Sequence, residues 1–383
     1  MEYIALKDVC KINMGQSPDS SSYNDNEDGI PFFQGNADFG ERYPVTRVWC
    51  NAPTKIAQPE DILISVRAPI GALNFAKEEC CIGRGLAALT PDRSKVSLGF
   101  IYWLLKGKNA ELNSKGTGST FKAISRKVLE ETMVPAIDFD KQHEYAEILE
   151  KIYSVIQKRK EELSALDDLI KARFVEMFGS IHDGKFEMKT LLEIVSSDKN
   201  SIKRGPFGGA LKKDDFVEEG YLVYEQRHAI HNDFEYAKYY ITQEKYEDMI
   251  GFKVVPGDLI ISCSGVTLGR IAEVPDGAKE GIINQALLKL SLNKELMMNT
   301  FFIQQFRGEE IQEILFGFSR GSGIPNMPSM SEVKAVKFIC PPLELQKQYC
   351  DFVHQVDKSK VAVQEALDET QLLFDSLMQK YFG

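Results

Sequence analysis

Two tracts of the chain repeat apolar residues at alternating spacings of four and three. Each tract runs for nearly five heptads without proline or internal glycine, which is the pattern of a long coiled-coil-like helix. The two seams match position for position at an offset of 204 residues. We therefore predict helices over about 141–178 and about 344–382. The residues of the helix-helix seam are Leu149, Ile152, Ile156, Leu163, Leu166 and Ile170 in the first helix, and Val353, Val356, Val363, Leu367, Phe374 and Leu377 in the second.

Polar residues interrupt both seams. Arg159 and Arg173 occupy seam positions in the first helix, and Lys360 and Thr370 occupy them in the second. Such residues fix the register of paired helices at some cost in stability. Because the chain passes through a globule between the two helices, we expect the helices to pack antiparallel. The globules would then lie at opposite ends of the helix pair, related by a pseudo-two-fold axis.

The regions before the helices carry a looser repeat of short apolar runs that follow turns. Pro59-Glu-Asp61-Ile-Leu-Ile-Ser65 is matched by Pro256-Gly-Asp258-Leu-Ile-Ile-Ser262, and Ile82–Leu89 is matched by Ile283–Leu290. Such runs are typical of short strands, and they alternate with helical stretches such as Leu98–Leu105. The pattern predicts two related α/β (α+β) globular domains. The predicted segments are a first globule at 1–138, a central helix at 139–179, a second globule at 180–340 and a C-terminal helix at 341–383.

Composition adds that the chain is a multidomain protein without a membrane span. It has 383 residues, and 46 basic against 56 acidic residues give a net charge of −10. There is no run of eighteen apolar residues, and the start lacks the regions of a secretion signal. The seven cysteines form no CxxC pair, so we expect buried free thiols rather than a zinc site or a disulfide framework. We expect a cytoplasmic protein.

The common catalytic motifs are missing from the sequence. It contains no P-loop, GxSxG elbow, HExxH, dinucleotide-binding glycine pattern, or Asp/Asn-Pro-Pro-aromatic tetrapeptide of the amino-methyltransferase kind. The five histidines are scattered, and His228 with His231 has no further ligands at metal-binding spacing. We therefore predict a chain with no catalytic residues and no metal site.

The negative net charge conceals one basic tract. Residues 93–127 hold eight Lys and Arg residues against Glu111 alone, a local net charge of +7. The tract includes the loop Lys115-Gly-Thr-Gly-Ser-Thr-Phe-Lys122, whose backbone N–H groups, hydroxyls and lysines suit phosphate. The second globule has comparable stretches at 202–209 and 318–326. The candidate phosphate-binding residues are Lys115, Thr117, Ser119, Lys122, Arg126, Lys203, Arg204, Arg320 and Ser322.

Polar side chains suited to hydrogen-bonding base edges occur at matching turns of the two globules. Gln34 follows Gly29-Ile-Pro-Phe-Phe, just as Gln226 follows Gly220-Tyr-Leu-Val-Tyr-Glu225. Arg84 and Gln285 occupy one equivalent position between matched apolar runs. Amide and guanidinium groups are the usual readers of bases in the major groove. The candidate base-reading residues are Gln34, Asn36, Arg84, Gln226, Arg227, Gln285 and Asn326.

With these motifs in place, the chain resembles the specificity (S) subunit of type I restriction-modification systems. The resemblance covers nearly the whole chain. It is carried by the proline-to-Lys-Gln segments Pro135–Gln142 and Pro341–Gln348 before the long helices, and by the repeated turn-strand motifs at Pro59 and Pro256. The Gly-Ser loops at 116–119 and 321–323 complete the pattern. The ordered duplication is specific, although no single short motif is diagnostic.

The resemblance implies a non-catalytic subunit that recognises double-stranded DNA for a methyltransferase and endonuclease complex in phage defence. Two target-recognition domains, 1–138 and 185–338, would each read one half of a bipartite asymmetric DNA target. The helices would set the spacing between the halves and dock two methyltransferase subunits, with restriction subunits joining in a full restriction system. No cofactor is expected on this chain, because S-adenosylmethionine and ATP would bind partner subunits. No membrane partner is expected.

Two features depart from the family pattern. The net acidity predicts weak DNA binding by the free subunit until its partners clamp the duplex. Lys141-Gln142-His-Glu-Tyr145 also has two more residues than Lys347-Gln348-Tyr349, which predicts helix starts that differ in detail. Two alternatives stay open from the residues alone. One is a non-DNA coiled-coil adaptor that scaffolds protein partners, and the other is an S-like module of a methyltransferase-only or other phage-defence complex.

Overall fold

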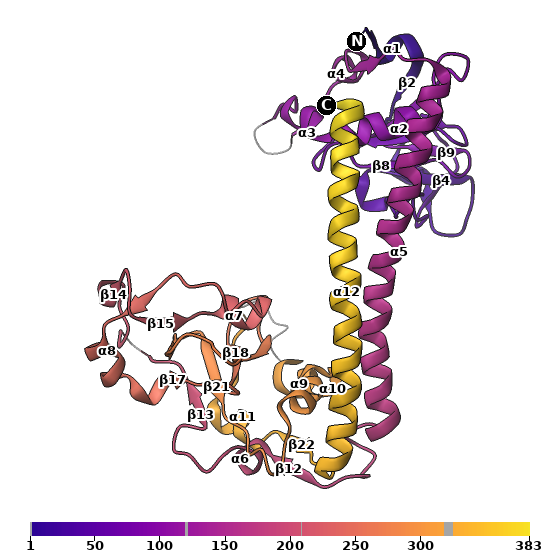
Figure 1. The fold of residues 1–383 in the computed structure, drawn as a ribbon. Helices are drawn as coiled ribbons and strands as arrows, with labels where there is room; N and C mark the ends of the chain where they lie inside the picture. The colour runs from indigo at the N-terminus through magenta and orange to yellow at the C-terminus, as the bar shows by residue number, and fades with distance from the viewer. Residues whose placement is uncertain (1, 119–121, 208, 318–324) are drawn as a thin grey trace. The chain divides into compact units, whose positions relative to one another are not determined.

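The computed structural model describes residues 2–118, 122–207, 209–317 and 325–383 (Figure 1). The chain divides into two compact units. Unit 1 consists of residues 1–161 with 364–383, and unit 2 consists of residues 162–363. Each unit therefore contains one globule together with a part of each long helix, α5 (Phe139–Phe178) and α12 (Leu343–Phe382).

The globule of unit 1 is built from short strands and short helices. Its strands are β1 (Tyr3–Ala5), β2 (Cys10–Met14), β3 (Tyr23–Asn24), β4 (Ile30–Phe33), β5 (Trp49–Cys50), β6 (Ile56–Ala57), β7 (Ile62–Ser65), β8 (Leu73–Phe75), β9 (Cys80–Ile82), β10 (Leu86–Pro91) and β11 (Met133–Pro135). Its helices are α1 (Leu6–Val9), α2 (Leu98–Gly107), α3 (Asn109–Ser114) and α4 (Arg126–Glu130), with 3-10 turns at Ser20–Ser22 and Asn36–Asp38.

Two mixed or antiparallel sheets form the body of this globule. One has the strand order β2-β10-β7-β8 and the other β3-β5-β4-β9-β6, while β1 pairs with β11 alone. The β4–β9 pair is parallel, and the other strand pairs are antiparallel. Strand β7 is buried at all four residues because both of its faces are covered, which explains its unbroken run of apolar side chains. Helix α2 packs with Phe100–Leu105 fully buried.

The globule of unit 2 repeats this plan. Its strands are β12 (Met188–Thr190), β13 (Ile202–Arg204), β14 (Phe216–Val217), β15 (Tyr221–Tyr224), β16 (Tyr240–Ile241), β17 (Lys253–Val254), β18 (Leu259–Ser262), β19 (Ile271–Glu273), β20 (Gly281–Ile283), β21 (Leu287–Leu290) and β22 (Lys337–Ile339). Its helices are α6 (Leu191–Ile194), α7 (Gln226–His231), α8 (Gln243–Asp248), α9 (Asn299–Arg307), α10 (Glu309–Phe316) and α11 (Met330–Ala335), with 3-10 turns at Lys213–Asp215 and Ile250–Phe252.

The sheet topology of unit 2 matches that of unit 1 strand for strand. The order β13-β21-β18-β19 corresponds to β2-β10-β7-β8, and β14-β16-β15-β20-β17 corresponds to β3-β5-β4-β9-β6. The parallel pair recurs as β15–β20, and β12 pairs with β22 as β1 pairs with β11. The predicted fold class, two related α/β globules with long paired helices, is confirmed.

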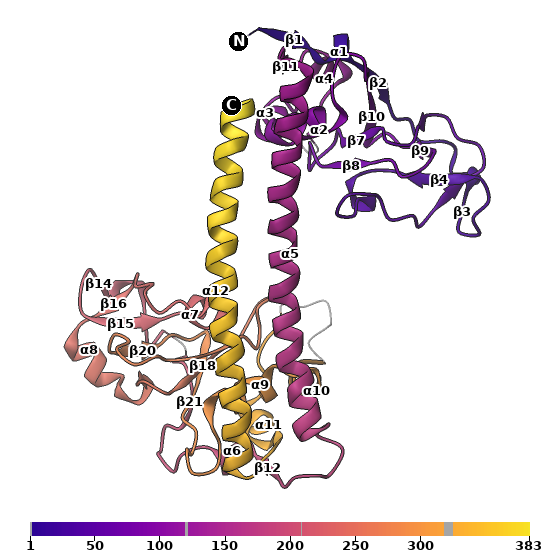
Figure 2. The same ribbon diagram turned by 45° about the vertical axis from the view of Figure 1, so that its right-hand side comes forward.

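In unit 1 the start of α5 packs against the end of α12, which makes the helices antiparallel. Tyr145 and Tyr381 stack with ring centroids 3.8 Å apart. Arg159 donates through Nη1 to the carbonyl oxygen of Ala366 and to Oγ1 of Thr370. These are two of the polar seam residues expected to fix register, and here they bond across the seam. Figures 1 and 2 show α12 in yellow beside α5.

In unit 2 the end of α5 packs against the start of α12 around a cluster of aromatic rings. The Tyr349 hydroxyl donates to the carbonyl oxygen of Ile170 at 3.2 Å, and its ring lies 5.5 Å from the rings of Phe174 and Phe178. Lys360 forms an ion pair with Asp167 at 2.6 Å. Across both units the predicted seam residues are all buried or half-buried.

The two helix starts are equivalent, which corrects the expected two-residue difference between them. Both α5 and α12 contain 40 residues and begin 204 positions apart. Gln142 is buried and its Oε1 accepts the backbone N–H of Ser97 at 2.8 Å. Gln346, rather than Gln348, is its counterpart, because Gln346 is buried and its Oε1 accepts the N–H of Met298 at 2.9 Å. Pro135 and Pro341 are 206 positions apart, so matching these prolines shifts the alignment of the two helices by two residues.

The structure also bears on the cysteines and on membrane association. All seven cysteines are free thiols, and each is buried except Cys340, which is half-buried. Burial raises the pKa of the Cys10 thiol to about 12, so it stays protonated. Within the described ranges, every helix falls short of the length or the apolar character needed to cross a bilayer.

Candidate nucleic-acid interface

In unit 1 the two sheets meet where β4 ends and where β9 turns into β10. Gly83 donates its N–H to Phe33 at 2.8 Å, and Gly85 donates its N–H to Gln34 at 3.1 Å. A Cβ at position 85 would lie 2.4 Å from the carbonyl oxygen of Gln34, so only glycine permits this approach. The Gly-Arg-Gly turn therefore holds Arg84 at a fixed, exposed position.

This turn brings together candidate base readers that lie 50 residues apart in sequence. Ser17 bridges them, because its Oγ accepts the backbone N–H of Arg84 at 3.3 Å and the Gln34 Nε2 group at 3.4 Å. The side chains of Gln34 and Arg84 are both exposed. Asn36 lies in the 3-10 turn that follows and is half-buried. The predicted base-reading residues of this globule thus lie together at one corner of its sheets.

Arg67 belongs to the same corner and was missed by the sequence reasoning. Val66 donates its N–H to the carbonyl oxygen of Gly85 at 2.9 Å, just beyond the end of the β7–β10 ladder, so the Arg67 segment adjoins the turn that carries Arg84. Arg67 is exposed and pairs with Ala123 in an isolated bridge. The signal was available, because Arg67 stands two residues after the repeated strand motif that ends at Ser65.

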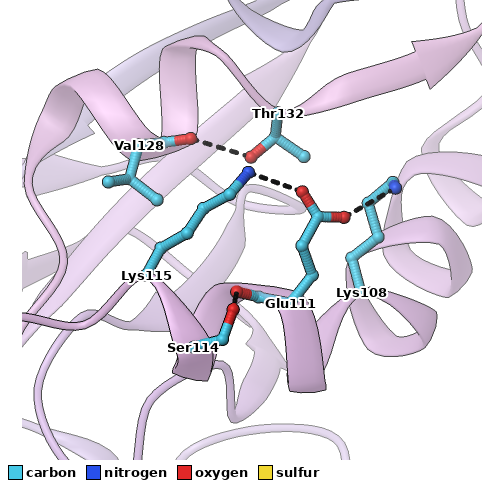
Figure 3. Close-up of polar contacts among 6 residues, drawn as sticks. All are labelled: Lys108, Glu111, Ser114, Lys115, Val128 and Thr132. Atoms are coloured by element: carbon cyan, nitrogen blue, oxygen red, sulfur yellow. Dashed lines mark hydrogen bonds and ion pairs between the residues drawn. The ribbon is translucent and has the colours of Figure 1, made fainter.

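The basic tract proves to be largely neutralised by carboxylates. Lys115 bonds Glu111 Oε1 at 2.5 Å, and Lys108 bonds Oε2 of the same residue at 2.9 Å (Figure 3). These hydrogen bonds, that of Lys115 first, lower the pKa of Glu111. Arg126 pairs with Glu130 at 2.7 Å. Further along the tract, Lys95, Arg93 and Lys127 pair with Asp92, Glu60 and Glu131.

Among the described residues of the tract, Lys106 and Lys122 have no carboxylate partner. Lys106 lies against the ring of Tyr153, whereas Lys122 is exposed and its side chain has no hydrogen bond or ion pair. Its carbonyl oxygen accepts the N–H of Ala68 at 3.0 Å, which places Lys122 beside the Arg67 turn. Thr117 exchanges backbone hydrogen bonds with Ala123 and is also exposed. Ser119, with Arg320 and Ser322 of the second globule, lies outside the described residues.

Unit 2 has a depression of about 420 Å³ at the equivalent corner. Gly205 directly follows β13, as Gly15 directly follows β2 in unit 1, and a Cβ at position 205 would lie 1.8 Å from the carbonyl oxygen of Asn284. Gln285, equivalent to Arg84, is exposed on the rim. The lining includes three candidate residues and one exposed aromatic ring, namely Arg204, Gln285, Asn326 and Phe207.

Two basic candidates of unit 2 rest on aromatic rings. The Arg204 guanidinium lies 5.4 Å from the ring centroid of Phe207 and donates to Asn326 Oδ1 at 3.3 Å. The Lys203 ammonium lies 4.6 Å from the ring centroid of Phe252. Stacking of this kind positions a cation without cancelling its charge, so Arg204 can still meet an anion or an acceptor at the depression.

The remaining candidates of unit 2, Gln226 and Arg227, differ in whether their side chains are available to a ligand. Gln226 is half-buried, and its Nε2 donates to the Ser264 hydroxyl at 3.0 Å and to the Ser264 and Ala286 carbonyl oxygens at 3.1 and 3.3 Å. That amide group holds the turn together. Arg227 is exposed on α7 and lies 4.4 Å from the ring centroid of Tyr236. Gln226 thus supports the surface, whereas Arg227 lies on it.

The surface offers hydrogen-bonding and charged groups rather than reactive ones. Within the described parts of the chain, no group of three or more His, Cys, Asp or Glu side chains is arranged to bind a metal ion. Arginine, lysine and amide side chains at fixed turns are the chemistry of nucleic-acid recognition. The same corner carries them in both units, on the same strand ends.

Comparison with known proteins agrees with this geometry. The profile of the family described as type I restriction modification DNA specificity domain matches residues 1–165 and again residues 186–370. The chain therefore belongs to this family, whose members are the non-catalytic specificity subunits of type I restriction-modification enzymes. The double match follows the internal repeat and agrees with the resemblance found in the sequence.

Three similar proteins illustrate the relationship. The MjaX type I restriction enzyme specificity subunit of Methanocaldococcus jannaschii is 39% identical over 180 residues, 47% of this chain and 41% of the relative. The EcoBI specificity subunit of Escherichia coli is 22% identical over 176 residues, 44% of this chain and 35% of the relative. The aligned part thus spans less than half of either curated relative. The crystal structure of a type I system S subunit from M. genitalium covers 100% of this chain and 96% of its own, with 17% identity and a TM-score of 0.60, and shows the same fold.

Proposed function

We propose that each unit of this specificity subunit reads one half of a bipartite, asymmetric DNA target. The observation that carries the proposal is the pair of equivalent corners, one per unit, where exposed polar side chains stand on matched strand ends. The scaffold is shared, but the side chains differ, as Arg84 and Gln285 illustrate. Two readers with different side chains on one scaffold suit a target whose halves differ in sequence.

The long helices support a second part of the proposal, the docking of two methyltransferase subunits and the fixing of the spacing between half-sites. Leu169 and Leu373 stand 204 positions apart on α5 and α12, and both are exposed, at 46% and 51%. Exposed leucines at equivalent positions offer the same apolar contact twice. S-adenosylmethionine and ATP would bind those partners and any restriction subunits, and the chemistry would take place there.

Exchange of one globule tests the bipartite reading. The chain is produced with its methyltransferase subunits in a host that lacks adenine methylation, and methylated adenines are mapped across the genome. We expect two specified halves separated by unspecified base pairs. Replacing residues 1–138 with the corresponding segment of another family member should change one half and leave the other and the spacer intact. A change in both halves, or a continuous motif, would contradict the proposal, and a non-DNA adaptor would leave no motif that depends on this chain.

Phosphate contacts are proposed for the candidate residues of the basic tract, with Lys122 as the strongest because it has no ion pair in the described structure. Lys115 and Arg126 are exposed and can exchange their half-buried carboxylate partners for phosphate, since ion pairs at the surface contribute little. Substituting Lys115, Lys122 or Arg126 by Ala in the assembled complex should lower the slope of log affinity against log salt by about 0.9 for each phosphate that is no longer neutralised. Lys127→Ala, in the same tract, is the matched control. A slope unchanged in all three variants would refute these phosphate contacts.

Base reading is proposed for the candidates whose side chains reach the surface. Gln34, Arg84, Arg227, Gln285 and Asn326 are exposed, and Asn36 is half-buried beside them. Gln226 contributes by holding the Ser264 turn in place. Substitution of a base reader changes the methylated motif at one position, whereas substitution of a positioning residue weakens recognition of the whole half-site. Motif mapping of single variants distinguishes the two roles.

A further inference from the structure

One pair of positions is equivalent in the two reading corners by backbone register as well as by sequence. In unit 1, Val66 donates its N–H to Gly85 at 2.9 Å, and Arg67 and Arg84 are the next residues outward on the two chains. In unit 2, Cys263 donates its N–H to Ala286 at 2.8 Å, and Ser264 and Gln285 are the next residues outward. Arg67 thus corresponds to Ser264, and Arg84 corresponds to Gln285.

The pair in unit 1 consists of two exposed guanidinium groups. Arg84 lies in the turn closed by the hydrogen bond from the Leu86 N–H to the Gly83 carbonyl oxygen at 3.0 Å, and Arg67 lies in the neighbouring segment that pairs with Ala123. Within the described residues neither side chain has a hydrogen bond or an ion pair with a carboxylate. Lys122 adds a third cation beside Arg67 without adding an acid. These exposed donors are free of protein acceptors and can therefore bind a ligand that supplies several acceptors.

Guanine supplies acceptors in the geometry that arginine requires. Its major-groove edge presents O6 and N7, and one guanidinium can donate to both. Adenine presents N7 as an acceptor but N6 as a donor, so it matches an amide and not a guanidinium. The arginine pair therefore fits an edge rich in acceptors, which distinguishes guanine from the other bases.

The pair in unit 2 carries no free cation. The Ser264 hydroxyl already accepts a hydrogen bond from Gln226 Nε2 at 3.0 Å. Gln285 is exposed, and its amide has no partner among the described residues. It stands on the rim of the depression beside Asn326, a second amide. A free amide offers one donor and one acceptor, the complement of adenine N7 and N6.

We propose that Arg84, supported by Arg67, selects guanine in the half-site of unit 1, and that Gln285 selects adenine in the half-site of unit 2. Positions 84 and 285 are then equivalent specificity-determining positions, and the base preference follows the side chain placed there. This inference rests on the proposed function, because it requires each unit to read its own half-site.

Motif mapping of reciprocal variants tests the inference in the complex with the methyltransferase subunits. Arg84→Gln should lose a guanine from the half-site of unit 1, by about 5-fold to 100-fold in preference for the original base pair. Gln285→Arg should move a position of the other half-site from adenine to guanine. The half-site of unit 1 is identified beforehand by exchange of residues 1–138.

Arg84→Lys is the matched control, because its ammonium keeps the charge and can still donate to guanine O6 and N7, but without the planar fork of the guanidinium. It should keep guanine at that position with a weaker preference than Arg84, and retain the salt dependence of binding. If Arg84→Gln leaves every specified base unchanged and weakens binding to all sequences alike, Arg84 grips phosphate and the inference is wrong. Unchanged specified bases in Gln285→Arg would refute its second half.

Different results would overturn the proposed function and the base assignments at positions 84 and 285. A wild-type complex that methylates no bipartite motif overturns the proposed function, and this inference with it. A bipartite motif that survives in all variants overturns only the inference. Far-UV circular dichroism and co-purification with the methyltransferase subunits show that each variant is folded and assembled before its motif is mapped.

Discussion

The two units share one backbone scaffold and differ in the side chains that pack on it and that lie on its surface. Gln142 and Gln346 perform the same task, each accepting the N–H of the residue that precedes a helix, Ser97 before α2 and Met298 before α9, and donating to backbone carbonyls. Tyr145 and Tyr349 also stand 204 positions apart, but Tyr145 is half-buried against Tyr381, whereas Tyr349 is fully buried. Backbone satisfaction has been kept in both copies, while packing and surface chemistry have diverged.

This difference indicates which features the duplicated architecture requires. A buried N–H or carbonyl without a partner is costly wherever it occurs, so both copies retain the same glutamine. Ring packing can be rearranged as long as volume is conserved, and a reading surface must differ if two half-sites differ. Stability experiments on matched positions can therefore separate the shared features from the divergent ones.

The largest expected difference is between the two tyrosines. Tyr349→Ala removes a fully buried ring from the cluster of Phe174, Phe178 and Phe301 and should destabilise unit 2 by about 3–5 kcal/mol. Tyr145→Ala removes one ring of an exposed-edge stack and should destabilise unit 1 by about 1 kcal/mol. Urea unfolding followed by far-UV circular dichroism measures both.

Tryptophan fluorescence distinguishes the units in the same experiment. Trp49 and Trp103, the two tryptophans of the chain, both belong to unit 1. Tyr349→Ala should therefore shift the transition seen by circular dichroism more than the transition seen by fluorescence. Equal losses in the two variants would show that the aromatic cluster of unit 2 contributes nothing beyond the helix pair itself.

The second comparison concerns the shared glutamines, for which equal effects are expected. Gln142→Leu and Gln346→Leu each leave a buried N–H and buried carbonyl oxygens unsatisfied, which should cost about 2–3 kcal/mol in either unit. Gln348→Leu is the control, because Gln348 is exposed and should be nearly neutral. A large cost for Gln348→Leu, or a difference above about 1 kcal/mol between the other two, would break the equivalence of the helix starts.

The sequence predicted the elements that depend on periodicity. The heptad pattern and the offset of 204 residues placed both long helices within a few residues of their ends. The repeated run ending at Ser65 and Ser262 predicted strands β7 and β18, which are buried on both sides. These elements were readable because their local pattern and their burial agree.

The candidate surface was less readable, because its chemistry depends on which side chains meet across the fold. The tract at 93–127 counts as +7 only while Asp92, Glu130 and Glu131, just outside it, are ignored. Those carboxylates pair with its cations in the structure. Gln226 looked like a base reader, yet its amide is bonded to the Ser264 turn. The three ion pairs join residues three or four positions apart and could have been read from that spacing, whereas the contact between Gln226 and Ser264, 38 positions apart, could not.

The smallest predicted effect concerns two cations at the ends of equivalent helices, Lys106 of α2 and Arg307 of α9. The Lys106 ammonium lies 3.8 Å from the ring centroid of Tyr153. Burial, and then the nearby Arg42, lower the pKa of Lys106 to about 8, below the ordinary 10.5. Burial also lowers the pKa of Arg307, but an arginine keeps its proton throughout the accessible pH range. Only unit 1 should therefore respond to pH through this position.

The expected sign follows from the lowered pKa of Lys106. Between pH 8 and about 10.5 the unfolded chain binds a proton that folded unit 1 releases, so raising the pH through this window removes a penalty on folding. Below pH 8 both states are protonated and the penalty is constant. Its total size should be about 1 kcal/mol, because solvent screens part of the effect. Lys106→Met, which cannot titrate, should lose this gain in stability.

The measurement compares Lys106→Met with the wild type at each pH, using urea unfolding followed by tryptophan fluorescence, which reports on unit 1. Comparison within each pH is needed because buried thiols such as Cys10, whose pKa is raised to about 12, destabilise the fold as the pH rises above their unfolded pKa. The free energy of unfolding of Lys106→Met minus that of the wild type should fall steadily between pH 8 and 10. Lys106→Arg, the side chain that unit 2 carries at this position, should show no such titration. If the difference in free energy of unfolding between Lys106→Met and the wild type stayed constant with pH, the Lys106 ammonium would be solvated in the folded unit. Lys106 and Arg307 would then not differ in their response to pH.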